Sequence, residues 1–307
     1  MYEIIAPGKL VLTGAYAVLE GGVATVIAVD RYATTTGVER TDRLSPEFRA
    51  AFPSGKGPVV DTSMLRENGE KLGLGSSAAA VVAAIASEEL EKGRDLEDST
   101  VRSGIFQRAY RAHREAQGGG SGLDIAASTY GGLLRYSLLS ANPNMLSLTF
   151  PDDLHWCVIA AGKPSSTKGM LRAIGAFRDS FPSRYDALMS ALVTASFSAA
   201  EMFESGSTRE VIERTSQFFD RLYELSEHAE VAIFTEEYRL LDNVARKEGG
   251  VFFPSGAGGG DIGVYFGPHP PSAAFFERVA SFQMKRVDLA LDLGGVRVRP
   301  LVAPIVS

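Results

Sequence analysis

Three glycine-rich segments place the strongest constraint on this chain of 307 residues. They are 73–78 (GLGSSA), 118–124 (GGGSGLD) and 255–261 (SGAGGGD). Because glycine has no side chain, such a loop lets backbone N–H groups approach a ligand, and a following helix adds the positive end of its dipole. Segment 73–78 leads into an alanine-rich helical pattern over 76–92. The sequence predicts a phosphate-binding helix start, while each loop taken alone is equally compatible with a tight turn.

The order of the remaining patterns predicts an α+β protein with two domains. Strand-like stretches come first, amphipathic helices follow, and the end is mixed. Strands are expected over 9–12, 23–29, 32–38, 133–136, 145–150, 155–161, 262–266, 287–292 and 296–300. Helices are expected over 76–92, 96–116, 169–177, 183–204, 208–228, 235–248 and 272–283, whereas 41–70 has no clear pattern. We expect a boundary near 150–160, with domains 1–155 and 156–307.

Composition excludes several classes of protein. One cysteine, Cys157, cannot form an intrachain disulfide or by itself a cysteine-rich zinc site. The net charge of −6 without long like-charge blocks argues against a nucleic-acid surface. No secretory pattern opens the sequence, and the longest apolar run, 78–86, has nine residues, about half of a bilayer span. We therefore expect a cytoplasmic protein without nucleic-acid or membrane partners.

Two common nucleotide-binding motifs do not explain segment 73–78. Its spacing fits the dinucleotide fingerprint, but the lead-in over 67–71 is no buried strand. A P-loop needs Ser or Thr after Gly-Lys, and Lys9, Lys56 and Lys163 are followed by leucine, glycine and proline. A helix start with two serines remains, where one serine can be an N-cap and the other can offer its hydroxyl to Mg²⁺.

Four segments in this order resemble the GHMP kinases. They are 6–19 (APGKLVLTGAYAVL), 73–79, 120–124 (GSGLD) and 255–263, which together span most of the chain. The resemblance implies a two-domain fold: an N-terminal ribosomal protein S5 domain 2-like part that binds ATP, and a C-terminal ferredoxin-like α+β part with added helices on the substrate side. It also implies a kinase that uses ATP and Mg²⁺.

The resemblance also implies roles for individual residues. The ATP phosphates would be bound by Gly73, Leu74, Gly75, Ser76, Ser77 and Ala78, with Ser77 as a metal ligand. Lys9 and Asp124 would be catalytic. The acceptor substrate would be bound by Lys9, Lys71, Ser121, Gly122, Ser166, Ser255 and Gly256. Without the family match, a lone lysine or aspartate is more often a solvated charge or a cap.

Within the family, the stretch 113–128, Lys71 and the segment 16–19 resemble phosphomevalonate kinases. Mevalonate kinases usually place a metal-binding glutamate near the position of His113, and most relatives have glutamate at the position of Ala15. The expected reaction is ATP-dependent phosphorylation of phosphomevalonate to mevalonate diphosphate. Alternatives are a kinase acting on mevalonate or another small alcohol, and a non-catalytic binding protein. We expect a monomer or a homodimer.

Overall fold

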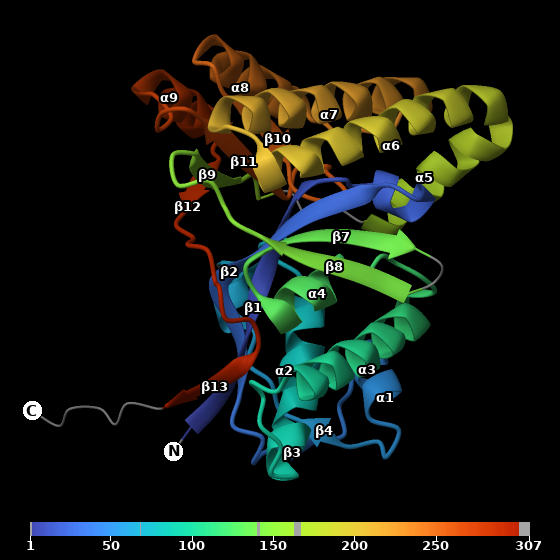
Figure 1. Ribbon diagram of the computed structural model, residues 1–307, viewed down its shortest axis with the longest axis vertical. Coiled ribbons are helices and arrows are strands. Elements are labelled where there is room, and N and C mark those ends of the chain that lie inside the picture. The colour runs from blue at the N-terminus through green and yellow to red at the C-terminus, as the bar shows by residue number, and fades with distance from the viewer. Residues whose placement is uncertain (1, 68, 140–141, 163–166, 301–307) are drawn as a thin grey trace, which may run out of the picture. The chain divides into compact units, whose positions relative to one another are not determined.

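The computed structural model describes residues 2–67, 69–139, 142–162 and 167–300 (Figure 1). Its helices are α1 (Pro46–Ala51), α2 (Ser76–Glu91), α3 (Ser99–Gln117), α4 (Leu123–Tyr130), α5 (Thr167–Ser180), α6 (Pro182–Ser205), α7 (Thr208–Ala229), α8 (Glu236–Lys247) and α9 (Ala273–Ser281), with short 3₁₀ turns η1 (Ala17–Glu20) and η2 (Ser63–Leu65). Its strands are β1 (Tyr2–Thr13), β2 (Val23–Thr35), β3 (Arg40–Thr41), β4 (Gly57–Pro58), β5 (Arg66–Glu67), β6 (Glu70–Lys71), β7 (Leu133–Leu139), β8 (Asn142–Leu148), β9 (His155–Ala160), β10 (Val251–Pro254), β11 (Ile262–Gly267), β12 (Lys285–Val287) and β13 (Arg297–Pro300). The predicted α+β class is confirmed.

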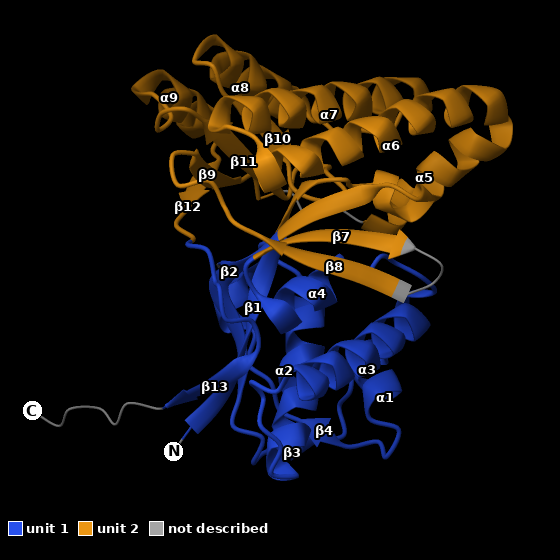
Figure 2. Cartoon of the chain, in the orientation of Figure 1, with its two compact units in different colours: residues 1–9, 27–132, 290–307 blue, residues 10–26, 133–289 orange. Residues whose placement is uncertain are grey.

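The chain forms two compact units that interleave along the sequence (Figure 2). Unit 1 holds residues 1–9, 27–132 and 290–307, and unit 2 holds residues 10–26 and 133–289. Strands β1 and β2 therefore contribute residues to both units. The predicted domains, 1–155 and 156–307, assume that the sequence divides at a single point. The compact units interleave along the sequence, and the predicted domain boundary stays a prediction.

The strands form two larger sheets and two short hairpins. The five-stranded sheet has the order β13-β1-β2-β7-β8, and the four-stranded sheet has the order β10-β11-β9-β12. In the smaller sheet each neighbouring pair is antiparallel, with β9 between β11 and β12. The hairpins β3-β4 and β5-β6 lie in the stretch 41–70 that shows no clear sequence pattern.

Helix α2 is largely buried within unit 1. Residues 78–87 are buried without a break, and the helix packs against α3 and α4. A helix that is apolar all round must lie inside the protein, and its alanines let neighbouring helices approach closely. The predicted helix 76–92 is confirmed, and its start at Ser76 fixes where its N-terminal amides lie.

Unit 2 buries an aromatic core between helices and the smaller sheet. Helices α6 and α7 run side by side (Figure 1), and a capping box formed by Ser207 and Glu210 starts α7. Phe252 contacts the rings of Tyr238 and Phe275 at centroid distances of 5.2 and 5.6 Å. These contacts pack α8 and α9 against β10, as expected for apolar helix faces. None of the described helices is both long and apolar enough to cross a bilayer.

Two strand predictions need correction. The stretches 23–29 and 32–38 form one strand, β2, because Asp30 does not interrupt it: the Asp30 N–H donates to the Ala290 carbonyl at 3.0 Å, and its carboxylate accepts from the Ala290 N–H at 2.7 Å. The strand expected over 287–292 is β12, at 285–287. It ends early because residues 290–292 pair with β2 instead: Leu291 forms an isolated bridge with Val29, and the Asp292 N–H donates to the Ala28 carbonyl at 2.9 Å.

Asp292 joins the C-terminal segment to β2 within unit 1. Its side chain is buried and pairs with Arg297 at 2.8 Å, while the Tyr32 hydroxyl donates to the same carboxylate at 2.8 Å. Burial raises the pKa of Asp292, but hydrogen bonds from Arg297, Tyr32 and the Gly295 N–H outweigh it and hold the pKa below its ordinary value. The carboxylate is therefore ionised and stabilises the fold at neutral pH.

We expect Asp292→Asn to lower the free energy of unfolding by about 3 kcal/mol, because it removes one partner of a buried ion pair. Urea unfolding followed by circular dichroism measures this. The matched control is Asp288→Asn, because Asp288 pairs with Arg286 on the surface with its side chain 86% exposed. The control should change stability by less than about 0.5 kcal/mol, and equal effects would contradict the prediction.

The effect of Asp292→Asn should also depend on pH. A carboxylate whose pKa is lower in the folded chain stabilises the fold above its unfolded value of about 4. That contribution is lost as the pH falls through the folded-state pKa. The difference between wild type and variant should therefore narrow below about pH 4, and a difference that widened on acidification would refute this assignment.

Candidate active site

Two left-handed glycines turn the chain into α2. Gly73 and Gly75 have φ angles of 71° and 74°, which residues with a Cβ atom rarely adopt. Gly75 is the N-cap of α2 and has no side chain to accept hydrogen bonds from the first-turn N–H groups. Such N–H groups, together with the helix dipole, favour an anion. The local geometry suits a bound phosphate, and binding of ATP by residues 73–78 stays a prediction.

Lys9 and Asp124 lie together beside Gly75. The Lys9 ammonium donates to the Gly73 carbonyl at 2.8 Å, and the Lys9 backbone N–H donates to the Leu74 carbonyl at 2.9 Å. A Cβ atom on Gly75 would lie 3.1 Å from Lys9 Cγ and 3.3 Å from Asp124 Cβ. The structure therefore brings the two predicted catalytic residues together at the start of α2. Their catalytic roles stay predictions.

Asp124 lies in the first turn of α4, a helix that the sequence patterns did not predict. Gly122 is its N-cap, with a φ of 78°, and one Asp124 oxygen accepts from the Ile125 N–H at 3.0 Å. The Ser128 hydroxyl donates to the Pro7 carbonyl at 2.7 Å and so ties α4 to the strand that carries Lys9. The sequence signal was available: a glycine followed by an acidic first turn and an apolar run.

His113 is the neighbour of Asp124 on α3. It is only 4% exposed, and its Nε2 lies 3.6 Å from Asp124 Oδ2 and 2.9 Å from Gln117 Nε2. Within the described ranges, its Nδ1 has no hydrogen-bond partner. The side chain that α3 presents to Asp124 is therefore an imidazole, and not a second carboxylate.

Glu47 is a site residue that the sequence analysis missed. It lies in the first turn of α1, where Ser45 is the N-cap and Pro46 the first helical residue. Its carboxylate accepts from the Ser45 hydroxyl at 2.8 Å, and the side chains of Ser77 and Gln117 help to lower its pKa. The order serine, proline, glutamate is a typical helix start and was readable from the sequence. The interaction with Ser77, thirty positions further along the chain, could not be read from the sequence.

The carboxylate of Glu47 is ionised at neutral pH. Partial burial raises the pKa of Glu47, but hydrogen bonds from its own backbone N–H and from Ser45, Ser77 and Gln117 outweigh burial and hold the pKa below its ordinary value. A negative charge therefore lies beside the serine that was predicted to bind a metal ion.

The other predicted substrate-side residues of unit 1 are near the surface or at the start of α4. Lys71 is exposed on β6, in the hairpin with β5. The Ser121 hydroxyl lies 3.5 Å from the Leu123 N–H, and Gly122 is the N-cap described above. Ser166 lies outside the described residues. Substrate contacts by these residues stay predictions.

Ser255 and Gly256 belong to unit 2. The buried Ser255 hydroxyl accepts from the Val11 N–H at 2.9 Å, and Gly256 has a φ of 83°. The Tyr16 hydroxyl donates to the Ala257 carbonyl at 2.7 Å. Two residues of the first motif therefore hold the third glycine-rich loop in place. The Ser255 hydroxyl already has this structural partner, and its substrate contact stays a prediction.

The side chains around Ser77 fit a nucleotide-bound magnesium ion. Mg²⁺ prefers oxygen ligands, and at nucleotide sites one or two protein groups share it with phosphates and water. Ser77 supplies a hydroxyl, and Glu47, whose pKa Ser77 helps to lower, supplies an ionised carboxylate. The described residues contain no group of three His, Cys, Asp or Glu side chains that could hold a metal alone. The donor set therefore suits a metal that arrives with a nucleotide.

We expect Gly75→Ala to destabilise the chain and to separate Lys9 from Asp124. A left-handed alanine costs about 1–2 kcal/mol, and crowding in a packed site adds about 1–3 kcal/mol. Gly93→Ala is the matched control, because Gly93 has a φ of 73° at the other end of α2 and nothing within 4 Å of an added Cβ atom. Urea unfolding should show the larger loss for Gly75→Ala, and equal losses would mean that the approach to Lys9 and Asp124 is not tight.

Comparisons with known proteins agree with this geometry. Residues 49–132 match the model of the GHMP kinases N terminal domain. The chain is 26% identical to a phosphomevalonate kinase of Streptomyces sp. (strain CL190), over 96% of this chain and 95% of that relative. It is 28% identical to a mevalonate kinase of Archaeoglobus fulgidus, over 67% and 75% of the two chains.

A solved structure shows the same fold. It is Streptococcus pneumoniae phosphomevalonate kinase in complex with phosphomevalonate and AMPPNP, with a TM-score of 0.76, 18% identity, and coverage of 95% of this chain and 100% of that one. The matched family model includes both the helix start at Ser76 and Asp124, and the relatives extend the likeness over nearly the whole chain. This chain therefore contains a segment that matches the GHMP kinases N terminal domain, and it is similar to GHMP kinases over nearly its whole length.

Proposed function

We propose that the protein is a kinase that transfers the γ-phosphoryl group of ATP to phosphomevalonate and so produces mevalonate diphosphate. The meeting of Lys9 and Asp124 beside Gly75 carries this proposal, because it places a cation and a carboxylate at an anion-binding helix start. The match of residues 49–132 to the GHMP kinases N terminal domain supports the use of ATP. Similarity to phosphomevalonate kinases over nearly the full length supports the acceptor.

The nucleotide would be held by the start of α2. The N–H groups of residues 73–78 bind the ATP phosphates, and the Ser77 hydroxyl takes part in holding Mg²⁺. When bound, Mg²⁺ neutralises charge on the phosphates and orients them. Phosphoryl transfer depends chiefly on positioning and charge neutralisation, so a rigid helix start is the main requirement on the protein.

Lys9 and Asp124 would act on the acceptor. A phosphomonoester has a second pKa near 6, so phosphomevalonate is largely a dianion at neutral pH. One of its oxygens attacks the γ-phosphorus, a new P–O bond forms, and the bond to ADP breaks. No strong general base is needed for this acceptor. Lys9 balances its charge and aligns it, while Asp124 keeps Lys9 in position.

An alcohol acceptor would change the catalytic role of Asp124. Mevalonate carries a hydroxyl proton that must leave during transfer, and Asp124 would then serve as the base.

The acceptor is proposed to contact Lys71, Ser121 and Gly122 of unit 1. The same role is proposed for Ser255 and Gly256 of unit 2.

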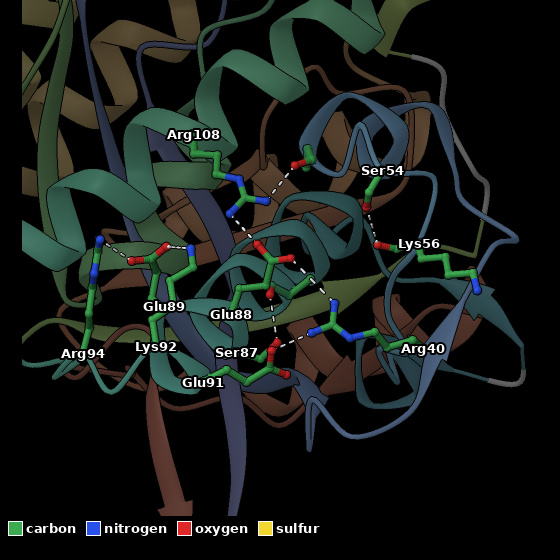
Figure 3. Close-up of polar contacts among 12 residues, drawn as sticks. Arg40, Ser54, Lys56, Ser87, Glu88, Glu89, Glu91, Lys92, Arg94 and Arg108 are labelled. Atoms are coloured by element: carbon green, nitrogen blue, oxygen red, sulfur yellow. Dashed lines mark hydrogen bonds and ion pairs between the residues drawn. The ribbon is translucent and has the colours of Figure 1, made fainter.

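We expect Asp124→Asn and Lys9→Met each to lower kcat by at least ~100-fold, because each removes a charge that positions the reacting groups. Steady-state kinetics with a coupled ADP-release assay measures this. Lys56→Met is the matched control, since Lys56 is an exposed lysine of unit 1 in a loop near α1 (Figure 3). Unchanged activity in either site variant would show that the chemistry lies elsewhere.

A panel of acceptors tests the substrate. The same assay is run with phosphomevalonate, mevalonate, homoserine and galactose at equal concentrations, and phosphomevalonate should be used at least ~100-fold more efficiently, a difference of about 2.7 kcal/mol. Preference for mevalonate or a sugar would replace the proposed acceptor. Absence of turnover with every acceptor, in a protein that still binds ATP, would favour a non-catalytic binding protein.

A further inference from the structure

Tyr16 occupies a strained turn shortly after the end of β1. Its φ and ψ angles are 64° and −51°, and the Ala17 N–H donates to the Ala15 carbonyl across it at 2.8 Å. These values define the rare γ-turn whose central residue has a positive φ, a conformation that is unfavourable for a residue with a Cβ atom. Such a conformation persists only where the surrounding contacts hold it.

The side chain of Tyr16 is fixed inside unit 2. It is 5% exposed, and its hydroxyl donates to the Ala257 carbonyl at 2.7 Å. The Met170 sulfur of α5 lies 3.7 Å from the same hydroxyl. Burial raises the pKa of Tyr16, so the hydroxyl keeps its proton and remains a donor at neutral pH. The strained turn therefore directs a buried hydrogen-bond donor at the third glycine-rich loop.

The loop 255–260 has few means of holding its own shape. Its glycines Gly256, Gly258, Gly259 and Gly260 all have left-handed φ angles, of 83°, 84°, 84° and 98°. Glycine loses more conformational freedom on ordering than other residues, and it has no side chain with which to make contacts. A single conformation of this loop therefore depends on partners from outside it.

Three segments that are far apart in the sequence supply such partners. The Val11 N–H on β1 donates to the Ser255 hydroxyl at 2.9 Å, and the Gly259 N–H donates to the Ile233 carbonyl at 2.9 Å. The bond from the Tyr16 hydroxyl lies between these two along the loop. The strained turn thus holds the middle of the loop, and the other two bonds hold its ends.

We propose that Tyr16 is a positioning residue for acceptor binding, whose hydroxyl holds the loop 255–260 in the conformation that receives the anionic acceptor. This inference rests on the proposed function, in which Ser255 and Gly256 contact phosphomevalonate. Tyr16 acts through the loop, since its hydroxyl proton is already donated to Ala257.

Two physical arguments support this role. Strained residues that neighbouring contacts maintain are concentrated at functional sites, where the strain serves to pre-organise the site. A loop that is already ordered also binds its ligand without a further loss of conformational freedom, so an anchor of the free loop increases affinity for the ligand. Loss of the anchor should therefore weaken binding of the acceptor and leave binding of the nucleotide unchanged.

Tyr16→Phe tests the proposal, because it keeps the ring and removes only the hydroxyl. Steady-state kinetics with the ADP-release assay gives the KM for each substrate while the other is saturating. We expect the KM for phosphomevalonate to rise about 5- to 10-fold, the effect of one lost hydrogen bond. The KM for ATP should stay within about 2-fold of wild type, because the predicted ATP-binding residues 73–78 are not part of this loop.

Tyr265→Phe is the matched control. Tyr265 also belongs to unit 2, is 1% exposed, and donates its hydroxyl proton to the His269 carbonyl at 3.3 Å. This variant removes the same kind of hydrogen bond outside the loop, so it should change neither KM. Urea unfolding of both variants compares their stabilities. If both variants raised the KM for the acceptor equally, the effect would come from lost stability and the proposal would be overturned.

Hydrogen exchange followed by mass spectrometry measures the loop directly, in the absence of any substrate. We expect the amides of residues 255–260 to exchange faster in Tyr16→Phe than in wild type or in Tyr265→Phe, because the loop opens more often. Unchanged exchange would contradict the proposal. A fall in kcat with both KM values unchanged, or an equal rise in both KM values, would also contradict it.

The outcomes distinguish this inference from the proposed function. If wild type uses phosphomevalonate and Tyr16→Phe has the same KM for it, the role of Tyr16 is refuted and the kinase stands. If wild type prefers another acceptor, the proposed substrate is replaced, and the KM for that acceptor together with loop exchange decides the role of Tyr16. If wild type turns over no acceptor, the proposed function is refuted and the inference with it.

Discussion

The close approach at Gly75 is the constraint on which the candidate site depends. Glycine is strongly favoured there, because the φ is 74° and an added Cβ atom would lie only 3.1 Å from Lys9 Cγ and 3.3 Å from Asp124 Cβ. The same glycine ends the loop in a left-handed conformation and starts α2 with an uncapped set of N–H groups. One position therefore determines the anion-binding helix start and the meeting of the two charged residues.

The rest of unit 1 keeps this arrangement rigid. The alanine-rich surface of α2 lets α3 and α4 pack closely, and Ser128 ties α4 to the backbone just before Lys9. Arg108 holds α1 against the far half of α2. Phosphoryl transfer gains most from fixed geometry, so these contacts away from the reacting groups have a functional consequence.

The elements with strong local signals were predicted well. Helix α2 follows from its alanines and from the loop before it, and helices α5 to α8 follow from amphipathic periodicity. Weak or contradictory local signals led to the errors. Asp30 looked like a strand end because its hydrogen-bond partner, Ala290, lies far away in the sequence. The elements α1, α4 and β10 are too short to show a clear periodic pattern.

The sequence by itself determined the fold class, the family resemblance, and the residue types at the site: a lysine after the first motif, a serine pair at a helix start, and an aspartate after a glycine run. These are properties of neighbouring residues, and local chemistry is enough to recognise them. Only the tertiary structure decided which of these residues lie together and which unforeseen ones join them. Lys9 and Asp124, or Asp124 and His113, meet because elements far apart in the sequence pack against one another. Such long-range packing produces no periodic pattern in the sequence.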